Sequence, residues 1–429
     1  MGGRRRSRSE LPHAPLTLVH PLSVPGAQVD GAPLLEELPR ALAMPALQLL
    51  RAVLAWSRDP AETAAALDSA AVGALERRLL DRPRPEAPWT PLAVLAGAMA
   101  DPLTARPDQV SLACLAVSDW AIDAGHEHTA LAYAEAAALA WPANARYAWV
   151  AGRMMRSHGR MKEAERWLRR AHRVAVWTDD WETQARSLNS LGNVHYTRGK
   201  FGTSKGLHLR ALRITSRREM RPLQGEVCHD LFVIHAETGD SLLAANFAEA
   251  AFHIYFPAHH RLLDLVGDIA HFWNSRGYFR RSLPVFEALL GRVTSPDQKL
   301  RAIAGAARAS GGIGDANTFD YFWAAARQLT PLVENTGLVA AAFFEIALGG
   351  FELRARDVAR EAVEIAVKEA RTAGVADVLV KASDLRDRMA NPSHIVSLTR
   401  VTDVREVPGE ELARSLLDSL REASLSNAN

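Results

Sequence analysis

Six histidines fall within residues 229–271, and imidazoles are the first candidates for chemistry because they bind metals and exchange protons near neutral pH. They are His229, His235, His253, His259, His260 and His271. A helical zinc site pairs two histidines at i and i+4 with an acid nearby, and none of the six shows that pairing. We therefore expect no bound metal and no cofactor.

Glycine-rich stretches offer a second kind of chemistry, phosphate binding. Gly199-Lys200 is similar to the end of a phosphate loop, but the earlier glycine and the following Ser or Thr are missing. The Gly-Gly-Ile-Gly run at 311–314 follows no strand. The sequence contains no G-x-S-x-G, no H-E-x-x-H and no convincing Cys–His arrangement. We therefore predict a protein that is not an enzyme.

Asparagine and arginine side chains at helical spacing offer binding chemistry instead. Asn189 and Asn193 are one helical turn apart, so both amides can face the same side of a helix. An amide can donate to a backbone carbonyl and accept from a backbone N–H at once, which suits an extended peptide. The alternative is that both amides are simply solvated. Arginines nearby would favour an acidic segment or a terminal carboxylate through bidentate hydrogen bonds.

A repeat in the sequence indicates which elements present these side chains. Seven glycines are separated by 34, 40, 40, 38, 35 and 37 residues. They are Gly125, Gly159, Gly199, Gly239, Gly277, Gly312 and Gly349. Each follows one helix-like stretch and precedes another, as expected where a helix ends in the left-handed conformation. A period of this length predicts stacked helical hairpins rather than a closed globule.

Three further columns support this alignment because they hold mostly small residues, which let two helices approach closely. Twelve residues after the glycine stand Ala137, Ala171, Ala211, Ala251, Leu289, Ala324 and Glu361. Five residues after it stand Ala130, Ala164, Ser204, Ala244, Ser282, Asn317 and Arg354. Seven residues before it stand Ser118, Gly152, Gly192, Phe232, Ala270, Gly305 and Ala342. The pattern is strongest over residues 111–296 and decays afterwards.

The repeat resembles the tetratricopeptide repeat (TPR) family. The clearest matches are LGNVHYTRGKF at 191–201 and AGRMMRSHGRM at 151–161. The sequence departs from the family pattern at Phe232, His195 and His235. The resemblance covers roughly residues 111–370, about seven units with some extended to roughly 38–40 residues. It implies an all-α fold, a right-handed α-solenoid of antiparallel helix pairs with helical caps at both ends.

The resemblance also implies where a partner binds, because the first helix of each TPR pair lines a concave groove. TPR proteins that hold peptides often place asparagines in these columns. Positions expected to be exposed on the first helices recur about four residues apart. The predicted partner-binding residues are Arg146, Trp149, Arg153, Arg156, Asn189, Asn193, Tyr196, His229, His271 and Asn274.

The remainder of the chain divides into flanking segments. Residues 1–33 are basic and proline-rich and predict a disordered tail. Residues 34–105 predict a helical cap or degenerate repeat, including one helix that starts at Asp59-Pro60 and runs to about Leu80. Residues 371–390 predict a capping helix. Residues 391–429 predict an extended stretch and then an amphipathic helix, which is either a second cap or a segment that docks on the array.

Charge and composition restrict the partner and the compartment. The net charge is only +2, yet residues 145–220 hold 17 Lys and Arg against 6 Asp and Glu. Part of this excess would form a stripe of cations on the second helices. We expect this stripe to be a solvated helix face, and binding of nucleic acid is the less favoured alternative. Cys114 and Cys228 read as reduced core thiols, so we expect a cytoplasmic protein. The sequence contains no run of eighteen apolar residues, so we predict no membrane span.

Two functions follow from this reading. The favoured one is an interaction scaffold that holds an extended and acidic peptide segment of a protein partner in the concave groove. The second is a peptide sensor that changes shape on binding and controls a response regulator or transcription.

Overall fold

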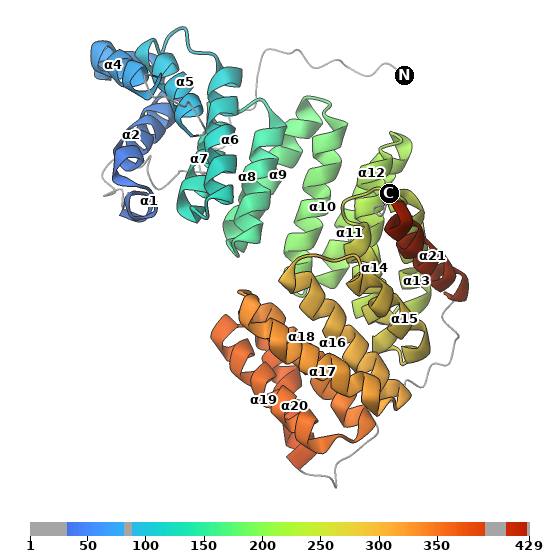
Figure 1. The fold of residues 1–429 in the computed structure, drawn as a ribbon. Helices are drawn as coiled ribbons and strands as arrows, with labels where there is room; N and C mark the ends of the chain where they lie inside the picture. Colours follow the sequence, from blue (N-terminus) through green and yellow to red (C-terminus); the bar gives the residue numbers. More distant parts are fainter. Residues whose placement is uncertain (1–31, 81–87, 391–408, 427–429) are drawn as a thin grey trace, which may run out of the picture. The chain divides into compact units, whose positions relative to one another are not determined.

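The computed structural model describes residues 32–80, 88–390 and 409–426. These residues form helices and turns, with no strand among them (Figure 1). The chain divides into two compact units, residues 1–220 and residues 221–429. The predicted tail before residue 32 and the predicted extended stretch at 394–404 lie outside the described residues.

Five helices precede the repeats in the amino-terminal unit. They are α1 (Ala32–Glu37), α2 (Arg40–Trp56), α3 (Pro60–Ala66), α4 (Ser69–Leu80) and α5 (Trp89–Ala100). Asp59 caps α3 as predicted, because its carboxylate accepts the backbone N–H groups of Ala61 and Glu62. The single helix predicted up to Leu80 is wrong, since an extended residue, Leu67, ends α3 before α4 begins.

Three helix pairs complete the amino-terminal unit. They are α6 (Pro107–Asp123) with α7 (Glu127–Ala140), α8 (Ala145–Ser157) with α9 (Met161–Trp177), and α10 (Trp181–Thr197) with α11 (Phe201–Arg217). Side-chain caps begin two of the first helices: Asn144 accepts from the N–H of Arg146, and Asp180 accepts from that of Thr183. One continuous apolar cluster reaches from Leu34 to Val194, so the five leading helices and the three pairs share a core.

The carboxy-terminal unit continues the pairs and ends in two single helices. The pairs are α12 (Arg221–Glu237) with α13 (Ser241–Tyr255), α14 (Leu262–Ser275) with α15 (Phe279–Leu290), α16 (Pro296–Ile313) with α17 (Ala316–Leu329), and α18 (Thr336–Leu353) with α19 (Arg356–Ala373). The single helices are α20 (Ala376–Ala390) and α21 (Glu410–Ser426). Helix α20 packs on α18 and α19, whereas α21 packs on α15.

A residue with positive φ marks the turn inside each pair. The first five predicted glycines, from Gly125 to Gly277, all hold this position. The predictions for Gly312 and Gly349 are wrong, because these residues lie inside α16 and α18. The left-handed residues of those pairs are Gly314, with φ 89°, and Arg354, with φ 64°.

Within the described parts of the chain, one helix, α18, is long and apolar enough to cross a bilayer by length and composition alone. In the structure 44% of that helix is buried, and it packs against α16 and α19. A core helix of a water-soluble protein passes the same test, so this helix is weak support for a membrane span.

Candidate partner-binding surface

The predicted residues of the amino-terminal unit lie on α8 and α10, the first helices of neighbouring pairs. We call the partly or fully exposed side chains of this stripe the first-helix surface: Trp149, Arg153, Arg156, Arg186, Asn193 and Tyr196. Arg146 is exposed at the start of α8, one turn before Trp149. Most of the residues predicted from this half of the sequence are therefore partly or fully exposed on α8 and α10.

Trp149 is the centre of the first-helix surface. Its indole Nε1 donates a hydrogen bond to Ser190 Oγ at 3.0 Å, which fixes the ring across the two helices. The guanidinium groups of Arg153 and Arg186 each lie 5.3 Å from the ring centroid. Cation–π attraction of this kind contributes about 0.5–1 kcal/mol at an exposed site. Arg186 also donates to Glu182 at 2.9 Å, so the ring and the acid together hold it in place.

The two predicted asparagines differ in solvent exposure. Asn193 is partly exposed, but Asn189 is 7% exposed, so the expectation that both amides face solvent is wrong. The imidazole of His208 donates from Nδ1 to Asn189 Oδ1 at 2.7 Å. His208 reaches this position because Gly192, one turn away, has no side chain to exclude it. Asn189 therefore holds α10 to α11.

In the carboxy-terminal unit two of the predicted partner-binding residues, His229 and Asn274, form hydrogen bonds between helices. His229 is 1% exposed and donates from Nε2 to Asp268 Oδ2 at 2.8 Å. Asn274 is also 1% exposed; its amide donates to Gly305 O at 2.8 Å, and its carbonyl accepts from Ser282 Oγ. The expectation that His229 and Asn274 face solvent is therefore wrong. Successive first helices pack on one another, and these polar side chains satisfy each other across the contact.

His271 is mostly enclosed as well and packs its ring edge on Phe286 at 4.9 Å. Burial lowers the pKa of His271 to about 4, so its imidazole is neutral at physiological pH. Burial alone would raise the pKa of Asp268, but hydrogen bonding from His229 and the charge of Arg301 lower it to about 2. Polar contacts therefore join each of these first helices to the next, and Arg308 of α16 continues the series by donating to Glu345 of α18 at 2.7 Å.

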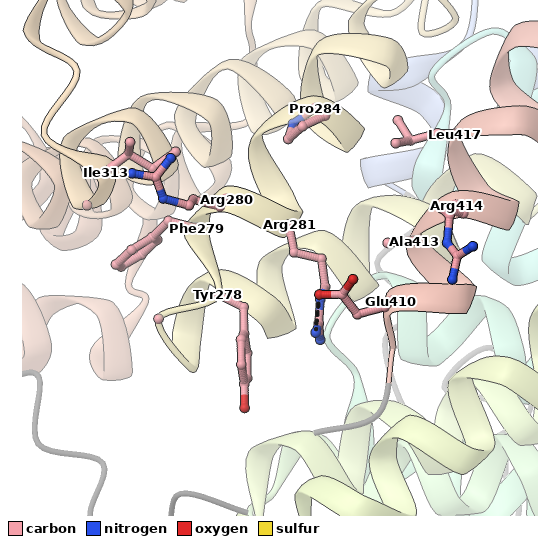
Figure 2. A pocket seen from close by; sticks show the side chains of 12 residues that line it. Tyr278, Phe279, Arg280, Arg281, Pro284, Ile313, Glu410, Ala413, Arg414 and Leu417 are labelled. Atoms are coloured by element: carbon pink, nitrogen blue, oxygen red, sulfur yellow. Dashed lines mark ion pairs between the residues drawn. The ribbon is translucent and has the colours of Figure 1, made fainter. Parts of the chain in front are cut away.

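Helix α21 rests on α15 and closes one side of a cavity of about 590 Å³ (Figure 2). Leu412, Leu416 and Leu420 of α21 are buried, as the amphipathic pattern predicts. Glu410 lies 3.5 Å from Arg281, whose guanidinium also stacks on Trp273 and Tyr278. The structure thus places α21 against α15, the second helix of a pair.

Leu416→Asp is expected to detach α21, because it puts a carboxylate at a position that is 0% exposed. Amide hydrogen exchange of residues 410–421 should accelerate by at least tenfold, while that of α16 and α18 stays unchanged. Asp418→Ala, on the exposed side of the same helix, is the control. Equal exchange in the two variants would contradict the observed packing of α21 on α15.

One packing unit recurs in every pair from α6/α7 to α18/α19. Counted from the left-handed residue, the position twelve later is at most 4% exposed and holds Ala137, Ala171, Ala211, Ala251, Leu289, Ala326 and Ala366. The buried position five later holds Ala130, Ala164, Ser204, Ala244, Ser282, Phe319 and Ala359. The buried position seven earlier holds Ser118, Gly152, Gly192, Phe232, Ala270, Ala307 and Ala347. The described helices from α6 to α19 are therefore a series of pairs that share one packing unit, the arrangement that the TPR resemblance predicts.

Comparisons with solved structures return proteins of related helical architecture. A STAND signal-transduction ATPase with a TPR sensor from Pyrococcus horikoshii is 11% identical, with 80% of this chain and 58% of that chain covered and a TM-score of 0.49. A Rap protein complexed with competence and sporulation factor is 10% identical, with 80% and 100% covered and a TM-score of 0.45. PilF of Pseudomonas aeruginosa is 16% identical, with 52% and 94% covered and a TM-score of 0.41. No family model and no curated protein matches the sequence.

Arg186, which belongs to the first-helix surface, was not among the residues predicted from the sequence. Arg186 lies one turn before Asn189 and Ser190 on α10, and it approaches the ring of Trp149 from the neighbouring helix. The available signal was helical spacing, since Arg186, Ser190 and Asn193 are four and then three residues apart along α10.

Proposed function

We propose that the chain is a protein-interaction scaffold and that its first-helix surface binds an extended, acidic segment of a protein partner. The observation that carries this proposal is the stack of Arg153, Trp149 and Arg186. It presents two oriented guanidinium groups beside a partly exposed aromatic ring.

Each element of that stack has a role in recognising such a segment. A guanidinium can bind a carboxylate with two parallel hydrogen bonds, and orienting it in advance lowers the entropy lost on binding. An indole held by a hydrogen bond gives a rigid apolar contact of the kind that dominates protein interfaces. Asn193, one turn beyond Asn189 on α10, lies where a backbone-binding amide could extend the contact along the segment.

Arg153→Ala combined with Arg186→Ala should weaken peptide binding by about 10- to 100-fold, as expected for loss of charge-assisted hydrogen bonds. The probe is a synthetic library of 12-residue peptides of random sequence, selected on the full chain and then measured singly by fluorescence anisotropy. We expect the selected peptides to be rich in Asp and Glu.

The matched control is Arg51→Ala with Arg78→Ala, which removes the same charge from exposed positions of the same unit outside the first-helix surface. Selection of peptides without acidic residues, or equal losses in the two double variants, would refute the proposal. The sensor function stays a prediction, and small-angle scattering with and without a selected peptide measures the shape change that it requires.

A further inference from the structure

The second helices α9 and α11 carry a basic surface that the proposed scaffold function does not use. Residues 159–177 and 198–218 together contain 13 Lys and Arg and only 2 Asp and Glu. Arg170 is buried over Trp167, and the other cations are partly or fully exposed. We call these exposed cations the basic face: Arg160, Lys162, Arg166, Arg169, Arg173, Arg198, Lys200, Lys205, Arg210, Arg213, Arg217 and Arg218.

The two acids on these helices are already engaged. Glu165 accepts hydrogen bonds from both Arg169 and Arg198, and Glu163 lies 3.7 Å from Arg160. No acid of the described chain forms an ion pair with Arg166, Arg173, Arg210 or Arg213. The cations of α9 and α11 are close enough to repel one another. Burial lowers the pKa of His172 on α9, and the positive charge of Arg210 on α11 lowers it further. The excess positive charge therefore remains available to an external anion.

The basic face is hollowed where α9 and α11 begin. A depression of about 980 Å³ is lined by cations from both pairs, including Arg160, Lys162, Arg166 and Lys200. From there Lys162, Arg166, Arg169 and Arg173 follow one another along α9 at intervals of three or four residues. This spacing places successive charges about 5–6 Å apart along the helix.

Two exposed tryptophans lie at the other end of α9. Trp177 ends α9 and is 41% exposed, and Trp181 begins α10 and is 36% exposed. The guanidinium of Arg218 lies 4.2 Å from the ring centroid of Trp181. Exposed acids, among them Asp179 and Glu182, also lie at this end, so aromatic stacking rather than phosphate binding suits it.

We propose that the basic face binds single-stranded nucleic acid, with phosphates along the cations of α9 and α11 and bases against Trp177 and Trp181. A cationic track next to aromatic rings is the arrangement that holds single strands without sequence preference. An acidic protein or an anionic membrane would need apolar contact at the centre of the interface. Of the large apolar side chains on α9 and α11, only Val176, Trp177 and Leu209 are exposed, and Val176 and Trp177 lie at the end of α9.

The test is fluorescence anisotropy of the full chain with a labelled 20-nucleotide oligouridylate. Replacing Arg166, Arg173, Arg210 and Arg213 with Gln should weaken binding about 100-fold at moderate salt. It should also reduce the slope of log K against log salt by about 2–3, because four phosphate contacts are lost. The control replaces Arg40, Arg51, Arg77 and Arg78 with Gln, which removes equal charge from exposed positions on α2 and α4. Arg4, Arg5, Arg6 and Arg8 are retained in both variants.

A second variant separates nucleic acid from a general polyanion. Trp181→Leu should lower oligouridylate affinity about tenfold and leave the salt slope unchanged, because base stacking contributes about 1–3 kcal/mol per base. The same variant should bind an abasic strand of equal length as tightly as the parent chain does. The proposal is overturned if the control loses as much affinity as the test variant. It is equally overturned if polyglutamate or phosphatidylserine vesicles bind as tightly as oligouridylate.

Discussion

Gly311→Ala is expected to lower the unfolding free energy of the carboxy-terminal unit by about 3 kcal/mol, at the upper end of the usual cost of overpacking. A Cβ on Gly311 would lie 2.2 Å from the carbonyl oxygen of Gly349 and 2.6 Å from its carbonyl carbon. These are backbone atoms, so no change of rotamer can relieve the clash. Helices α16 and α18 would have to separate, and the buried contacts between them would be lost.

The control for this prediction is Gly267→Ala, inside α14 of the same unit. Its Cβ would meet only Leu289 Cδ2 at 3.5 Å, an ordinary contact. Replacing a glycine by alanine inside a helix stabilises it by about 0.5–1 kcal/mol, so this variant should be neutral or more stable. Urea denaturation followed by circular dichroism measures both. If the two variants unfold at the same urea concentration, the close approach of α16 and α18 is wrong.

Glycine spacing predicted the turns correctly as far as Gly277 and then failed for a physical reason. The run at 311–314 contains three glycines, and only contact with a distant helix decides which of them is left-handed. Gly311 is held against Gly349, and Gly314 takes the turn. In the next pair Arg354 adopts the left-handed conformation, which costs a non-glycine residue roughly 1–2 kcal/mol and which no sequence pattern signals.

The apparent decay of the alanine columns after residue 296 has the same origin. Counting from Gly312 and Gly349 placed the column at Ala324 and Glu361, both of which are exposed. Counting from the observed turns moves it by two and five residues to Ala326 and Ala366, both 0% exposed. The columns therefore continue to α19, and local sequence contained that information once the turn was known.

The candidate site was harder to predict than the fold because burial depends on residues far away in sequence. Asn189 is covered by His208, and His229 is covered by Asp268 from the next pair. Helical spacing shows which side chains share a face, but it does not show which neighbour fills the space above them. Trp149 is partly exposed and Arg153 is exposed, as expected for surface residues, and partner binding there remains a proposal.

Glu352 is expected to make the stability of the carboxy-terminal unit depend on pH. Burial raises the pKa of Glu352 to about 7, with a further contribution from Glu345 and opposition from Arg308. Its Oε2 is buried without a hydrogen-bond partner in the described chain. Because this pKa lies above the ordinary value of 4.5, the folded chain retains a proton that the unfolded chain releases. Stability therefore falls as the pH rises from about 4.5 to about 7, and the loss is complete above that range.

Glu352→Gln removes the ionisable group, so it should stabilise the unit by about 2–3 kcal/mol at pH 8 and have little effect at pH 4. Urea unfolding of both chains at pH 4, 6 and 8 measures the difference. Glu364→Gln, at an exposed position on α19, is the control and should show no such trend. A difference between the Glu352 variant and the parent that stays constant with pH would mean that Glu352 ionises normally in the folded chain. In that case the burial of the Glu352 carboxyl on α18 near Arg308 and Glu345 would be wrong.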